Sequence, residues 1–107
     1  MLEGHIAESF EAAGSDVPVC GWPLDIHELI FWRRNVPIER FPMLMRMRDY
    51  WEDAIFTTSE LPEVVGEVEA LIELLPANTA LVASLEKFRD ACASAISSQR
   101  NLYMICD

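Results

Sequence analysis

The sequence SELPEVVGEVEALIELL at residues 59–75 is the strongest indication of fold in the chain. Its apolar residues recur at spacings of three and four, which places them on one stripe of a helix with 3.6 residues per turn. Ser59 is a favourable N-cap, Pro62 is tolerated in the first turn, and Pro76 ends the pattern. We therefore predict an amphipathic helix that buries Leu61, Val64, Val65, Val68, Leu71, Ile72 and Leu75.

A second helix with the same period is predicted at residues 79–97. Asn78 or Thr79 can cap its start, and only two or three residues connect it to the first helix. A connection this short forces the two helices to lie antiparallel as neighbours, so that each covers the apolar stripe of the other. The second stripe comprises Leu81, Val82, Leu85, Phe88, Cys92, Ala95 and Ile96.

Two further helices are expected upstream of this hairpin. Asp25 and Glu28 have the spacing of a capping box, which would open a helix that continues to Trp32 and stops before Pro37. The next helix is predicted from about residue 41 to residue 53, because apolar side chains can line one of its faces.

A short strand is expected at residues 102–106, where an apolar run follows a polar stretch. Residues 17–20 and 54–58 are its candidate partners. Residues 1–16 have few large apolar side chains, and we expect them to form a frayed helix or a flexible arm. The prediction is therefore a mainly α fold, with α+β as the alternative, in which residues 17–107 form a single four-helix-like domain.

Composition limits the classes of partner. The chain has 107 residues, is 51% hydrophobic, and carries a net charge of −10 from 18 acidic and 8 basic residues. Such a charge disfavours contacts with the phosphates of nucleic acids and with anionic membranes. Three widely spaced cysteines without a C-x-x-C pair argue against a disulfide framework, and no signal peptide is recognisable. We expect a cytoplasmic protein that binds neither nucleic acid nor membrane.

An uncompensated acidic set lies on the first hairpin helix. No basic residue interrupts it, and some of its members are like-charged pairs four residues apart, which mildly destabilise a helix. One hypothesis is that this face docks a partner protein with a basic surface, because complementary charge accelerates association and selects the partner. The alternative is an ordinary solvated surface. The set comprises Glu60, Glu63, Glu67, Glu69 and Glu73.

A basic and aromatic set lies at residues 33–51. Five arginines against one glutamate at residues 33–48 give a local charge of +4, since 5 − 1 = 4. These side chains could grip an acidic or planar partner, or they could pair with carboxylates of the same chain while the aromatic rings fill the core. Methionines near Trp51 would also allow a homodimer. The set comprises Arg33, Arg34, Arg40, Arg46, Arg48 and Trp51, with Trp32 and Tyr50 nearby.

A third candidate is the carboxylate group Asp49, Glu52 and Asp53. Paired carboxylates can perform acid-base chemistry or bind a hard cation. However, the chain contains no EF-hand spacing, no E-x-x-H segment, no P-loop and no G-x-S-x-G motif. We therefore predict a non-enzymatic inhibitor, immunity-type or adaptor protein without cofactor or metal. The alternative is a small enzyme or ligand-binding protein that uses these carboxylates beside an aromatic pocket.

Overall fold

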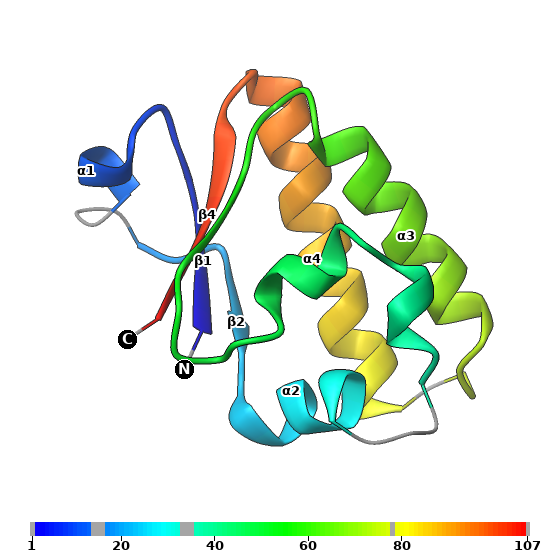
Figure 1. Ribbon diagram of the computed structural model, residues 1–107. Helices are drawn as coiled ribbons and strands as arrows, with labels where there is room; N and C mark the ends of the chain where they lie inside the picture. Colours follow the sequence, from blue (N-terminus) through cyan, green and yellow to red (C-terminus); the bar gives the residue numbers. More distant parts are fainter. Residues whose placement is uncertain (1, 14–16, 33–35, 78, 107) are drawn as a thin grey trace.

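The computed structural model describes residues 2–13, 17–32, 36–77 and 79–106, and this part of the chain forms an α+β domain (Figure 1). Its strands β1 to β4 make one antiparallel sheet in the order β2-β1-β4-β3. Helix α4 lies against the sheet, and α3 packs on α4 (Figure 1). The prediction of a mainly α, four-helix-like domain is therefore wrong, because a complete sheet forms one side of the core. No helix in these described ranges is long and apolar enough to span a membrane.

The predicted hairpin is present as α3 (Leu61–Glu73) and α4 (Ala80–Ser98). The central members of both predicted stripes are fully buried, and the outer members are partly buried around them. Thr79 caps α4, since its hydroxyl accepts the backbone N–H of Val82 at 3.2 Å. Glu60, rather than Ser59, occupies the capping position of α3.

The strand β1 (Leu2–Ala7) lies inside the sheet, between β2 (Cys20–Trp22) and β4 (Asn101–Cys106). Residues 2–7 are thus a central strand and not part of a frayed arm. The side chain of Leu2 is fully buried. A Cβ at Gly4 would overlap Cys20 Sγ, so this strand can approach β2 closely only with glycine at that position. The long partner strand, β4, comes from the opposite end of the chain, and no local pattern reveals that pairing.

The C-terminal strand is confirmed, and one of its two candidate partners pairs with it. The strand β3 (Ala54–Phe56) runs antiparallel to β4, with Ile55 opposite Tyr103. The other candidate segment, residues 17–20, overlaps β2 only at Cys20, and β2 pairs with β1 instead. On the face of the sheet away from α4, the short helix α1 (Phe10–Ala13) packs Phe10 edge-on against Tyr103, with ring centroids 6.1 Å apart.

The helix predicted at residues 41–53 does not form. Two 3₁₀ turns, η1 (Ile38–Arg40) and η2 (Leu44–Met47), lead instead into the loop before β3. In a 3₁₀ helix, side chains three residues apart point the same way. Five of the buried side chains of this segment follow that period, and Met43 is buried in addition to them: Ile38, Phe41, Leu44, Met47 and Tyr50.

The helix α2 (Leu24–Phe31) is confirmed, but its predicted capping box is absent. Pro23 occupies the N-cap position, where no side chain caps the helix. The carboxylate of Asp25 instead accepts the neighbouring N–H of Ile26 at 3.0 Å. Helix α2 packs against α4 with its buried side, and its other side faces the loop that follows η2.

Candidate functional site

The glutamates predicted as one acidic face lie on two sides of α3. Successive residues of a helix are rotated by about 100°, so Glu67 and Glu69 point about 160° apart. Glu69 and Glu73 are exposed on one flank, whereas Glu63 and Glu67 belong to the other. The five glutamates therefore do not form a single docking face.

Two of these glutamates stabilise the local structure. Glu60 forms an ion pair with Arg46 at 2.6 Å and accepts the backbone N–H and the hydroxyl of Thr57, each at 3.0 Å. The hydrogen bond from Arg46 lowers the pKa of Glu60 to about 2. The carboxylate of Glu67 accepts the N–H groups of Met43 and Leu44, at 3.1 and 3.0 Å, and so holds the start of η2 against α3.

The predicted basic patch is also divided. The guanidinium of Arg46 lies 5.9 Å from the ring centroid of Phe56, and that of Arg48 lies 4.9 Å from the indole of Trp32. Arg40 is exposed and takes part in neither of these contacts. Arg33 and Arg34 lie outside the described residues. Arg46 thus pairs with a carboxylate of the same chain, and both Arg46 and Arg48 contact its aromatic rings.

The structure nevertheless brings members of two predicted sets together. Arg46, Arg48 and Trp51 line the same groove as the carboxylates Asp49 and Glu52. The groove has a volume of about 890 Å³ and lies between α2 and the segment from η2 to the loop before β3. We call it the aromatic groove, and its remaining lining residues are Leu24, Glu28, Trp32, Met45 and Tyr50.

The wall of this groove that α2 contributes was not predicted from the sequence. Leu24, Glu28 and Trp32 are spaced four residues apart, which puts them on the same side of α2. That spacing was the available signal for the wall that α2 contributes. Asp53, by contrast, does not line the groove with Asp49 and Glu52; its carboxylate accepts the backbone N–H of Cys106 at 2.7 Å.

Tyr50, which lines the groove, packs against His27 of α2, with ring centroids 4.9 Å apart. The imidazole of His27 is fully buried, and its Nε2 lies 2.8 Å from the carbonyl oxygen of Arg48. A carbonyl only accepts, so Nε2 carries the hydrogen and Nδ1, which has no partner among the described residues, is the unprotonated nitrogen of a neutral ring. Burial lowers the pKa of His27, which favours this neutral form. The Tyr50 hydroxyl donates to the carbonyl of Trp22 at 3.1 Å.

The wall of the groove exposes two indoles. Trp51 is 68% exposed and Trp32 is 56% exposed, although tryptophan is one of the residues that a fold most readily buries. The carboxylate of Asp49 accepts the N–H of Trp51 at 3.0 Å, which sets the loop conformation that presents the indole. Tyr50 packs edge-on against Trp51, with ring centroids 5.1 Å apart. The indole of Trp51 is thus held by contacts with its two preceding residues.

The carboxylates of the groove give it a net negative charge. Within the described ranges, no ion pair involves Glu28, Asp49 or Glu52. These three carboxylates contribute −3, Arg48 contributes +1, and Arg46 is neutralised by Glu60, so the groove carries −2. A cation is the complement of such a surface, since carboxylates attract it and an indole face binds it.

The thiols of Cys20 and Cys92 are buried parts of the core. Burial raises the pKa of Cys20 to about 11 and that of Cys92 to about 12, so both remain protonated at neutral pH. Among the described residues, no group of three or more His, Cys, Asp or Glu side chains could hold a metal ion.

Comparison of the chain with protein-family models, with curated proteins and with solved structures finds no match. The geometry and charge of the aromatic groove are therefore the basis for a functional proposal.

Proposed function

We propose that this protein is a small, non-enzymatic protein-interaction module that binds a basic segment of a partner protein in the aromatic groove. The observation that supports the proposal most strongly is the exposure of Trp32 and Trp51 in one groove. Exposed clusters of large apolar side chains are uncommon on monomeric proteins and mark interaction sites. Tryptophan, tyrosine and arginine, all present here, are the residues that most often dominate binding energy at protein interfaces.

The charge of the groove supports a basic partner rather than an acidic one. Glu28, Asp49 and Glu52 line the same groove as the indoles, and a lysine or arginine that enters can contact both a carboxylate and an aromatic face. The existing contact of Arg48 with Trp32 is an intramolecular instance of this interaction. The net charge of −10 would also accelerate the approach of a basic segment.

The acidic face of α3 is a weaker candidate for the contact surface. Glu60 and Glu67 already bind groups of the same chain, and Glu69 and Glu73 are not accompanied by an exposed aromatic side chain on α3 within the described ranges. Solvent-exposed charges contribute to association rate more than to affinity. We therefore place the main contact in the groove and treat the α3 carboxylates as part of the general negative field.

The test is a binding titration with a labelled peptide that contains two arginines among glycines and serines, followed by fluorescence anisotropy. Two double variants remove the same charge at different places: Asp49→Asn with Glu52→Gln in the groove, and Glu69→Gln with Glu73→Gln on α3. The groove variant should weaken binding by about tenfold, whereas the α3 variant should weaken it by about twofold or less.

The single variant Trp51→Ala tests the aromatic part of the proposal. Loss of a cation–π contact worth about 0.5–2 kcal/mol corresponds to a loss of affinity of roughly 2- to 30-fold. The control is Leu74→Ala, which removes another exposed apolar side chain that does not line the groove. Equal effects of Trp51→Ala and Leu74→Ala, or equal effects of the two charge variants, would reject the groove as the site.

A further inference from the structure

One cation of the chain already lies over an indole of the aromatic groove. The guanidinium of Arg48 is 4.9 Å from the ring centroid of Trp32, a distance at which a cation is attracted to an aromatic face. Trp51, the other exposed indole of the groove, has no cation over it among the described residues. The two indoles are therefore not equally available to a partner, because a side chain of the protein itself lies over Trp32.

Backbone hydrogen bonds hold both residues of this contact in place. The carbonyl oxygen of Arg48 accepts the N–H of the buried His27 at 2.8 Å, and the N–H of Arg48 donates to the carbonyl of Met45 at 3.1 Å. On α2, the N–H of Trp32 donates to the carbonyl of Glu28 at 3.0 Å. Replacing the side chain of Arg48 keeps these three bonds, so it removes the cation and leaves the walls of the groove in place.

The contact between Arg48 and Trp32 is weak enough for a partner to replace it. The side chain of Arg48 is exposed, and within the described ranges it forms no ion pair. A cation–π contact at an exposed site corresponds to roughly a two- to fivefold change in a binding constant. A lysine or arginine of a partner can make the same contact with the indole and gain further contacts along its own segment.

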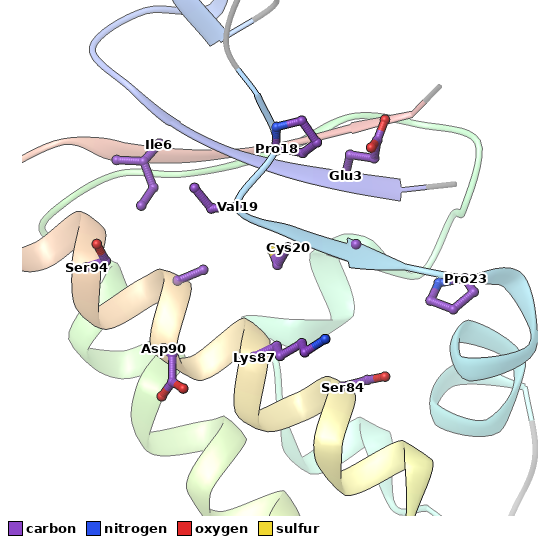
Figure 2. A pocket seen from close by; sticks show the side chains of 12 residues that line it. Glu3, Ile6, Pro18, Val19, Cys20, Pro23, Ser84, Lys87, Asp90 and Ser94 are labelled. Atoms are coloured by element: carbon purple, nitrogen blue, oxygen red, sulfur yellow. The ribbon is translucent and has the colours of Figure 1, made fainter.

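Lys87 offers a matched comparison in another groove, which lies between β2 and α4 and has a volume of about 750 Å³. Figure 2 shows the side chain of Lys87 extending from α4 into that groove. Among the described residues, Lys87 resembles Arg48 in being exposed and in forming no ion pair, but no aromatic side chain lines its groove. Removal of either cation makes the protein more negative by one charge, but only removal of Arg48 uncovers an indole.

We propose that Arg48 is an internal competitor for the aromatic groove: it occupies the cation site on Trp32 in the free protein, and a basic segment of the partner displaces it on binding. This role of Arg48 rests on the function proposed for the groove and identifies a residue that sets its selectivity. Competition of this kind lowers the affinity for every cation, so that binding is restricted to segments that make further contacts in the groove.

The test uses the two-arginine peptide and the anisotropy titration proposed for the groove, with the unmodified chain, Arg48→Gln and Lys87→Gln. Arg48→Gln should bind the peptide about threefold more tightly or better, because Trp32 is free and the groove has lost a positive charge. Lys87→Gln should change the affinity by about twofold or less. In a Trp32→Ala background, the gain from Arg48→Gln should also fall to about twofold or less, because only the effect of charge remains.

The possible failures are distinguishable. If the unmodified protein binds the peptide and Arg48→Gln binds it equally or more weakly, the competitor role is overturned while the groove remains the binding site. An equal gain from Lys87→Gln, or an equal gain from Arg48→Gln with and without Trp32, would also overturn it, because net charge alone would then account for the effect. If neither the unmodified protein nor Arg48→Gln binds the peptide, the function proposed for the groove fails together with the competitor role.

Discussion

Replacing Glu67 by alanine removes a carboxylate that accepts the backbone N–H groups of both Met43 and Leu44. A hydrogen bond to a charged group contributes about 1.5–3 kcal/mol, so the two bonds set an upper bound of about 6 kcal/mol. Glu67 is only partly buried, and water can replace some of this bonding. Relief of the repulsion with Glu63 returns about 0.2–0.5 kcal/mol. We therefore expect Glu67→Ala to lower the free energy of unfolding by about 2–3 kcal/mol.

Urea denaturation followed by circular dichroism measures this change, and Glu69→Ala is the matched control. Glu69 is exposed on the opposite flank of α3, where a substitution should change the free energy by about 0.5 kcal/mol or less. Glu67→Gln keeps one acceptor oxygen and should give an intermediate loss. If Glu67→Ala and Glu69→Ala differ by less than about 0.5 kcal/mol, the carboxylate of Glu67 does not hold η2 and this reasoning is refuted.

Three further predictions concern stability and titration. Gly4→Ala forces a Cβ against Cys20 Sγ and should lower the free energy of unfolding by about 1–3 kcal/mol, and adding Cys20→Ala should recover part of that loss in the same denaturation assay. The pKa of His27 is lowered in the fold, so the unfolded chain binds the proton more tightly. The contribution of the neutral His27 to the free energy of unfolding should therefore be fully present above pH 6.5, the ordinary pKa of histidine, and should be lost as the pH falls below 6.5. His27→Gln should lack this acid-dependent loss when unfolding is measured at several pH values, and an equal pH dependence in both proteins would contradict the assignment. Glu60 should titrate at a pKa of about 2 by NMR, and Arg46→Gln should move that pKa back towards 4.5.

The helical hairpin could be predicted because its signal is local. Apolar residues at spacings of three and four determine both the period of each helix and the face that it buries, and Pro76 marks the end of the first helix. The C-terminal strand was predicted from another local signal, an apolar run that follows a polar stretch.

The sheet as a whole could not be predicted in this way. The central strand β1 has a glycine at residue 4 and only two large aliphatic side chains, and its partner β4 lies nearly the whole chain away. Strand pairing across such a separation leaves no mark in a short window. Residues 41–53 show the opposite error. The spacing of Leu44, Met47, Trp51 and Ala54 fits one face of an α-helix, but the segment forms the 3₁₀ turn η2 and a loop in which Trp51 is exposed.

Most residues of the candidate site were predicted, but as two separate sets. Charge and aromatic content singled out Arg46, Arg48 and Trp51, and a separate argument singled out Asp49 and Glu52. Their union in one groove depends on how α2 packs beside the loop, and that packing is tertiary information. The role of Glu67 could likewise not be predicted from the sequence, because its partners are backbone N–H groups 23 and 24 residues away.

The most direct test of the aromatic groove uses the indole ¹⁵N–¹H signals of the three tryptophans in the unmodified protein. Trp32 and Trp51 are exposed in the groove, whereas Trp22 is buried beneath α4 and serves as the internal reference. Addition of the arginine-containing peptide should shift the signals of Trp51 and Trp32 in a saturable way and leave that of Trp22 in place. Unchanged signals for Trp51 and Trp32, or equal shifts with a peptide in which glutamates replace the arginines, would contradict the proposed recognition of a basic segment.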